Sequence, residues 1–159
     1  SHNSSARYRE IIDRFHAPGI AVQAGTVFGF DHDDRSVFRT SVEFYRDVGL
    51  DSATISVLIP YPGTPMFDRL DAEQRILTRD WEKYDGKRHV VFQPALMSPE
   101  ELLMGTEWAA RQFYSMRSIA GRMRRSRTGL WWNVVRNLGY HMALRNYSHG
   151  GYNPEQNIP

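Results

Sequence analysis

The stretch IAVQAGTVFGF, residues 20–30, decides the fold class of this chain. It follows the break at Pro18-Gly19 and is rich in Val, Ile, Phe and Thr, which predicts a β-strand. Two small residues, Gly25 and Gly29, interrupt this strand. Glycine within a strand indicates that another group approaches the backbone closely.

The segments that follow predict a parallel partner for this strand. The apolar residues from Val37 to Val48 have helical spacing, and Gly49 supplies a left-handed helix end. ATISVLI, residues 53–59, predicts a second strand that ends at Pro60. A strand, a helix and a strand with short connections predict two parallel strands joined by a right-handed crossover. Two parallel strands are too few for a finished sheet, so we expect the sheet to continue upstream of this sequence.

Helices flank the two predicted strands. Ser4 or Ser5 can cap a first helix, residues 98–101 combine a cap, a first-turn proline and a capping box, and Ser126 or Thr128 opens a last helix. The side chains that we expect on the buried faces are Tyr8, Ile11, Ile12 and Phe15 in the first helix, Leu102, Leu103, Thr106, Ala109, Ala110, Phe113 and Met116 in the second, and Trp131, Val134, Val135, Leu138 and Met142 in the last.

Composition sets limits on the chemistry. The 159 residues are 41% hydrophobic and contain 20 Lys and Arg against 18 Asp and Glu, which suits a folded chain near neutrality. There is no cysteine, which excludes disulfides and thiolate metal sites. No apolar run approaches the roughly 20 residues of a membrane span. We expect a cytoplasmic protein.

The end of the first strand is the leading candidate site. Ligands of parallel α/β folds bind beyond the carboxyl ends of the strands. Gly25 and Gly29 would let a flat ligand lie against the backbone, and Asp31 could form a hydrogen bond to a ribose or an amino group. The plainer interpretation is that both glycines allow close helix–strand packing.

Two further features near the strand ends each leave two interpretations open. The loop from Pro60 to Pro65, with the ring of Tyr61, could rim a pocket or form a rigid turn. The acidic turn of residues 31–34 could ligate a metal ion, but Asp33 or Asp34 as a helix cap explains these residues more simply.

An arginine cluster precedes two tryptophans near the C-terminus. Its members are Arg117, Arg122, Arg124, Arg125 and Arg127, followed by Trp131 and Trp132. Basic residues with aromatics can bind single-stranded nucleic acid. A solvated helix end is the simpler interpretation, since runs of charge usually have that origin.

Ordered motifs make this chain resemble a known family. The pattern Gly25-x-Val27-x-Gly29 is similar to the glycine-hydrophobic-glycine pattern on the fifth strand of radical S-adenosylmethionine (SAM) domains. The branch of that family with an N-terminal cobalamin-binding domain, which includes tetrapyrrole cyclases and hopanoid methylases, resembles this chain over about residues 19–120. The segments that carry this second resemblance are 31–34, 60–65, 75–81, 84–86 and 92–102.

The resemblance implies a fold and a set of cofactors. The fold would be α/β, the C-terminal part of a partial (β/α)6 TIM-like barrel with two parallel strands, followed by a C-terminal α-helical extension. In the family, a CxxxCxxC loop ligates a [4Fe-4S] cluster that cleaves S-adenosylmethionine to a 5′-deoxyadenosyl radical. This chain lacks that loop, so we expect no cofactor in this fragment, with S-adenosylmethionine, the cluster and possible cobalamin belonging to the parent enzyme.

The resemblance also implies site residues. Gly25, Val27 and Gly29 would lie along the adenine, and the strand end with the following loop would line the other side of the cavity. This chain departs from the family pattern at His32, where the family has glutamate, and at Gln74, where the branch has glycine, which affects a turn. The full set of expected cofactor-binding residues is Gly25, Val27, Gly29, Asp31, Ser56, Leu58, Pro60, Tyr61, Gly63 and Thr64; we expect no catalytic residue and no metal ligand.

The sequence divides into four segments on this interpretation. The last βα units of the barrel would occupy residues 4–70, an irregular connection 71–97, the helical extension 98–146 and a loose tail 147–159.

The leading hypothesis is a fragment of a radical SAM iron–sulfur oxidoreductase that methylates, cyclises or otherwise functionalises a C–H bond of a hydrophobic substrate. Without the cluster-binding cysteines it would be inactive alone. Its expected partners are the missing N-terminal part of the parent and, through an uncovered strand edge, further copies in a homo-oligomer or strand swap. We expect no nucleic acid and no membrane span. The alternative is a self-contained module whose Arg- and Trp-rich helices bind nucleic acid or a protein.

Overall fold

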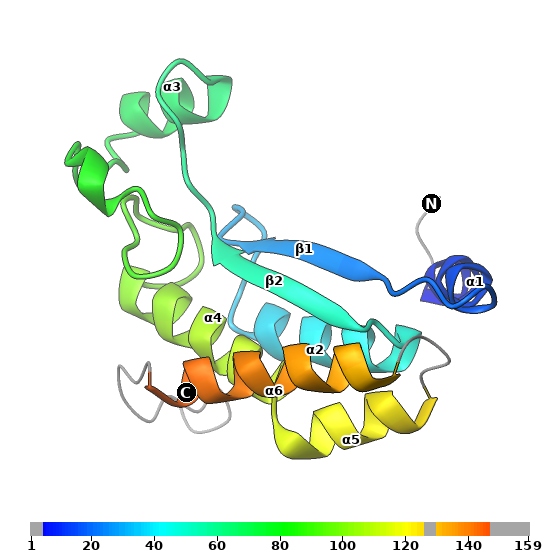
Figure 1. Ribbon diagram of the computed structural model, residues 1–159. Helices are drawn as coiled ribbons and strands as arrows, with labels where there is room; N and C mark the ends of the chain where they lie inside the picture. The colour runs from blue at the N-terminus through cyan, green and yellow to red at the C-terminus, as the bar shows by residue number, and fades with distance from the viewer. Residues whose placement is uncertain (1–4, 126–129, 147–159) are drawn as a thin grey trace.

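The computed structural model describes residues 5–125 and 130–146 (Figure 1). The predicted tail, 147–159, and the predicted start of the last helix at Ser126 or Thr128 lie outside these ranges. The elements in chain order are α1 (Ser5–His16), β1 (Gln23–Phe28), α2 (Ser36–Val48), β2 (Ser52–Val57), α3 (Pro65–Ala72), the 3-10 turn η1 (Trp81–Lys83), α4 (Pro99–Phe113), α5 (Met116–Arg125) and α6 (Leu130–Asn146).

The two strands form a parallel pair, as predicted. Gln23 pairs with Ser52 at one end and Phe28 with Val57 at the other. The α/β class with two parallel strands is therefore confirmed, and among the described residues these strands form a two-stranded sheet. The barrel and the oligomer that we expected to complete the sheet stay predictions.

Helices α2, α4 and α6 lie on the same side of the strands (Figure 1). Phe28 points to this side, and its ring meets the ring of Phe38 edge to face, with 5.1 Å between the ring centres. The main core gathers there because each of these elements contributes apolar side chains to it. Its buried members are Phe28, Phe38, Val42, Val57, Leu70, Phe92, Met97, Leu102 and Ala109.

Local signals placed the end of α2 and the start of α4 correctly, whereas both strands, at Gln23–Phe28 and Ser52–Val57, are shorter than the predicted 20–30 and 53–59. Gly49 ends α2 in the left-handed region with φ 80°. Ser98 and Glu101 form the predicted capping box at the start of α4. Gln74, which replaces the glycine of the resembling branch, adopts φ 58°, a conformation that favours glycine.

The prediction of buried faces was wrong in three places. Of the four apolar side chains predicted to be buried in α1, Ile12 is buried, while Tyr8, Ile11 and Phe15 are exposed because α1 packs on α2 with one edge. Met116 is exposed and belongs to a separate helix, α5, rather than to the stripe of α4. In α6 the apolar side chains Trp131, Val135 and Met142 point to solvent.

A buried polar cluster explains why these apolar side chains of α6 point to solvent. Asp51, at the start of β2, accepts a hydrogen bond from the backbone N–H of Val22 at 2.7 Å and lies 2.7 Å from His16 Nε2. Asn133 Nδ2 donates to the Asp51 carboxylate at 3.3 Å, and Asn137 Nδ2 donates to the Asp51 carbonyl at 3.2 Å. Buried polar groups need partners, so α6 presents its asparagines inward.

Within the described ranges, no helix has both the length and the apolar character needed to cross a bilayer.

Candidate functional site

In the described part of the chain, helices leave one face of the strand pair uncovered (Figure 1). Along β1 the side chains alternate, so Thr26 and Phe28 point to the helices and Gln23, Gly25 and Val27 to the other side. Thr26 Oγ1 lies 2.7 Å from the hydroxyl of Tyr45 on the helical side. On the other side Val27 is 41% exposed. We call this side the open face; it consists of Gln23, Gly25, Val27, Thr54 and Ser56.

The strand register places small and polar residues together on the open face. Gly25 pairs with Thr54, and Val27 pairs with Ser56. A Cβ atom added at Gly25 would meet no atom within 4 Å, so no packing contact among the described residues requires glycine there. The face thus offers a bare stretch of backbone beside two hydroxyl groups.

Gly29 has a different role from Gly25. Its φ of 114° is unfavourable for other residues, and an added Cβ would lie 2.9 Å from Leu102 Cδ2 and 3.1 Å from Phe92 Cζ. Its N–H donates to the Asp33 carboxylate at 2.9 Å. Close packing therefore accounts for Gly29, as the plainer interpretation held.

Asp31 is bound by two arginines. Its carboxylate accepts from Arg75 at 2.9 Å and lies 2.7 Å from Arg69 of α3. The hydrogen bond from Arg75, reinforced by Arg69, holds the pKa of Asp31 below its usual value against the opposing effect of burial. Asp31 therefore ties the end of β1 to α3 and its following turn.

Replacing Asp31 with asparagine should lower the free energy of unfolding by at most about 1 kcal/mol at pH 7, since this ion pair is partly exposed. Because the folded-state pKa is depressed, the stabilisation is present above the unfolded pKa and is lost as the pH falls through the folded pKa. Urea unfolding of both proteins between pH 7 and about pH 2 measures this. A difference in the free energy of unfolding between the two proteins that stays constant over that pH range would contradict this prediction.

The other carboxylates of the acidic turn bind backbone. Asp33 also accepts from the N–H of Phe30 at 3.0 Å, and Asp34 accepts from the N–H of Ser36, the first residue of α2, at 2.8 Å. The described residues contain no group of three side chains placed to hold a metal ion. Asp34 thus binds the first residue of α2, as the simpler interpretation implied, although the cap position itself is Arg35, whose side chain makes no capping hydrogen bond.

The loop after β2 is a turn followed by a helix cap. Gly63 has φ 78°, Thr64 Oγ1 donates to the carbonyl of Tyr61 at 2.6 Å, and the same oxygen accepts from the N–H of Phe67 at 3.3 Å. Pro60 is buried, whereas the Tyr61 ring is exposed. Local hydrogen bonds and the cap explain the conformation of this loop. Of the expected site residues in the loop, Tyr61 has an exposed side chain that takes no part in the turn.

Apart from the four in the loop after β2, the structure brings the expected site residues into two groups. Gly29, Asp31 and Leu58 line a pocket of about 30 Å³, which holds little more than a water molecule. Gly25, Val27 and Ser56 share the open face with Thr54, which sequence analysis missed. The alternation of the second strand, combined with the parallel register, would have found Thr54.

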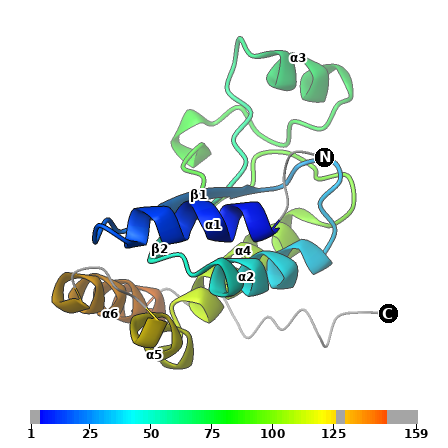
Figure 2. The ribbon, with the colours of Figure 1, turned by 90° about the vertical axis from the view of Figure 1, so that its right-hand side faces the viewer.

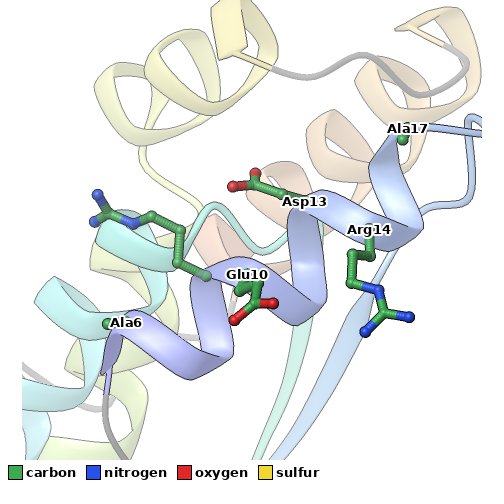
Figure 3. A pocket seen from close by; sticks show the side chains of 6 residues that line it. Ala6, Glu10, Asp13, Arg14 and Ala17 are labelled. Carbon is green, nitrogen blue, oxygen red and sulfur yellow. The ribbon is translucent and has the colours of Figure 1, made fainter.

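A wider hollow of about 660 Å³ runs along α1 (Figure 3). Its lining contains two cationic and two anionic side chains, and none of the expected site residues belongs to it. The lining residues are Ala6, Arg9, Glu10, Asp13, Arg14 and Ala17.

The arginine cluster is divided by the structure. Arg122 is 5% exposed and donates to the carbonyls of Asp51 at 2.7 Å and Phe113 at 2.9 Å. Its guanidinium lies 3.9 Å from the centre of the Phe113 ring. Both interpretations of the cluster, solvated helix end and nucleic-acid contact, are therefore wrong for Arg122, whereas Arg117 and Arg124 are exposed.

Known proteins share parts of this sequence. No family model matches the chain. The bacteriochlorophyllide d C-12(1)-methyltransferase of Chlorobaculum tepidum is 31% identical over 121 residues, which cover 76% of this chain and 26% of that protein. The C-8(2)-methyltransferase of the same organism is 27% identical over 56% of this chain and 20% of its own length. Biotin synthase of a Sulfurihydrogenibium species is 32% identical over 43% of this chain and 20% of its own length.

The fold and these similarities define an α/β chain that is related, at a coarse level, to the radical SAM enzymes. Two of the similar proteins are named as methyltransferases and one as biotin synthase, so the similarity does not select the cobalamin-binding branch. The chain spans about a quarter or less of the length of these relatives.

Proposed function

We propose that this chain is part of a radical SAM iron–sulfur enzyme that methylates, cyclises or otherwise functionalises a C–H bond of a hydrophobic substrate. The open face would form one wall of its cofactor and substrate cavity. Two relatives carry the names of bacteriochlorophyllide d methyltransferases, which agrees with methylation as the reaction.

The observation that carries the proposal is the exposure of the open face. Parallel strands normally bury both faces, yet here helices cover one face and leave Gly25 and Val27 of the other accessible. Among the residues that the structure describes, Gly25 has no neighbour that requires the absence of a side chain. A flat ligand lying against the backbone would explain why glycine occupies position 25.

The residues of this chain suit one of the proposed cofactors, S-adenosylmethionine. The backbone at Gly25 and the apolar side chain of Val27 suit an adenine ring, and the hydroxyls of Thr54 and Ser56 suit its polar edge or the ribose. Bound S-adenosylmethionine and a reduced [4Fe-4S] cluster would supply the radical chemistry. The chain contains no cysteine, so the cluster would be held by residues outside this sequence, and we assign no residue here to cobalamin.

The role of this chain would be to bind and orient. Positioning a ligand on a rigid strand pair limits its motion, and the apolar core beneath the strands keeps the wall from deforming. Tyr61 could close the rim beyond β2. By itself the chain is expected to produce no 5′-deoxyadenosine from S-adenosylmethionine and dithionite.

Replacing Gly25 with leucine in the parent enzyme should lower the rate of 5′-deoxyadenosine formation by about tenfold or more, because the side chain would occupy the ligand's place. It should not unfold the strand, since nothing lies within 4 Å of the added Cβ. Gly121→Leu is the matched control, because an added Cβ there also meets nothing within 4 Å but lies in α5.

Equal activities of the Gly25→Leu and Gly121→Leu enzymes, at equal iron content and equal stability, would contradict the placement of the cofactor. The family assignment has a separate test. It fails if the gene encodes no CxxxCxxC loop upstream of Ser4.

A further inference from the structure

Helix α6 has its polar and apolar sides reversed relative to a helix that packs on a core. Its inner side carries Asn133 and Asn137, which are 3% and 0% exposed. Its outer side carries Trp131 and Trp132, which are 78% and 72% exposed. Hydrogen bonds from both asparagine amide groups to Asp51 explain the inner side of α6, so the exposed tryptophans are the side chains without an explanation.

The exposed apolar residues form one continuous surface. On a helix with 3.6 residues per turn, positions 131, 135 and 142 point in directions within about 40° of one another around the helix axis. Position 132 lies beside this stripe, with Gly139 between them. Val135 and Met142 are 42% and 61% exposed. We call Trp131, Trp132, Val135 and Met142 the outer face of α6.

The surroundings of the outer face are cationic. Helix α5 lies beside α6 (Figures 1 and 2) and exposes Arg117 and Arg124. Between Glu107 and Glu155 the sequence contains no aspartate or glutamate. The sequence from residue 108 to 154, which includes α5 and α6, therefore carries no formal negative side-chain charge, and the buried Asp51 of the neighbouring strand lies on the inner side of α6.

We infer that the outer face of α6 binds the surface of an anionic lipid bilayer, with Trp131 and Trp132 inserted at the level of the headgroups. Tryptophan is favoured at this depth because its ring is amphipathic. An apolar helix face with adjacent cations is the pattern of an interfacial helix, which lies in the membrane surface without crossing it. Arg117 and Arg124 would contribute attraction to anionic headgroups.

Two other occupants fit the outer face less well. Single-stranded nucleic acid would stack on the tryptophan rings but leave Val135 and Met142 uncovered. A second copy in a symmetric pair would bring arginines of both copies together, with no carboxylate of this region to neutralise them. A bilayer accepts the aliphatic side chains and the arginines at once.

This inference does not depend on the proposed function. The open face and the outer face of α6 share no residue, so loss of vesicle binding and loss of S-adenosylmethionine cleavage are separate results. A membrane-bound enzyme would meet a hydrophobic substrate where such a substrate partitions.

Vesicle sedimentation of the 159-residue chain tests the inference. With equal parts of phosphatidylglycerol and phosphatidylcholine we expect binding at least about tenfold stronger than with phosphatidylcholine alone, weakening as salt is raised. Indole emission should shift to shorter wavelength on binding. Equal binding to both vesicles, or none to either, would overturn the inference.

Variants locate the binding surface. Trp131→Gln with Trp132→Gln should weaken vesicle binding about tenfold or more, since two inserted rings are lost. Trp81→Gln is the matched control, because Trp81 is also exposed but lies in η1, and it should bind as the unaltered chain does. Equal binding by both variants would refute the assignment to α6.

The rival occupants have their own signatures. Salt-sensitive binding of a single-stranded oligonucleotide that vesicles do not displace would overturn the inference in favour of nucleic acid. A dimer in sedimentation equilibrium that the Trp131→Gln and Trp132→Gln changes dissociate would overturn it in favour of a second copy. Circular dichroism confirms that each variant is folded.

Discussion

Replacing Arg122 with methionine is expected to lower the free energy of unfolding by about 3 to 5 kcal/mol, because it removes two buried hydrogen bonds from a charged group, each worth about 1.5 to 3 kcal/mol. Methionine fills the space of the arginine stem but donates no hydrogen bond. The buried carbonyl of Phe113, which the guanidinium reaches at 2.9 Å, would lose this donor, and the carbonyl of Asp51, reached at 2.7 Å, would keep only the weaker hydrogen bond from Asn137 at 3.2 Å. Urea unfolding followed by circular dichroism measures the change.

The same replacement at Arg124 is the control. Arg124 lies two residues away in the same helix and is exposed, so Arg124→Met should change stability by no more than about 0.5 kcal/mol. Burial lowers the pKa of Arg122 to about 10, which still leaves it charged at neutral pH. Similar losses for both variants would show that Arg122 does not hold the cluster around Asp51 together.

Replacing Gly105 with alanine is expected to lower the free energy of unfolding by about 2 to 3 kcal/mol. Gly105 lies in α4, and a Cβ atom there would overlap the ring of Phe38 in α2, which is fully buried. Overpacking of this kind outweighs the gain of about 1 kcal/mol that alanine brings in a helix. Thermal or urea unfolding measures the difference.

Two variants separate overpacking from helix propensity. Gly121→Ala, in α5, places its Cβ where nothing lies within 4 Å, so it should keep the helical gain of up to about 1 kcal/mol. Phe38→Leu should be less harmful in the Gly105→Ala background than alone, because the smaller side chain leaves room for the methyl group. Additive losses in that double variant would contradict close packing of α2 on α4 at this point.

Much of the fold was predictable because its signals are local. A run of β-branched residues, a glycine with positive φ and a serine three residues before a glutamate each act within one turn or one strand. Residues 20–30, Gly49 and Ser98 therefore indicated the strand, the end of α2 and the start of α4 correctly. The parallel pairing followed from the short connections.

The candidate site was only partly predictable, because a glycine gives no indication of what approaches it. Gly25 and Gly29 look alike in the sequence, and the structure separates them. Leu102 and Phe92, more than sixty residues downstream, occupy the space beside Gly29, whereas no atom of the described chain lies beside an added Cβ at Gly25. Thr54 became part of the open face only through its register with Gly25.

The sequence by itself determined the two parallel strands, the helix boundaries set by caps and glycines, and the absence of thiolate ligands. The tertiary structure alone decided that Arg122 is buried and that α6 turns its asparagines inward. The physical reason is Asp51, a buried carboxylate whose partners come from segments far apart in the chain. Leaving its polar groups unpaired would cost about 1 to 3 kcal/mol each, enough to override the apolar pattern of α6 and leave its tryptophans exposed.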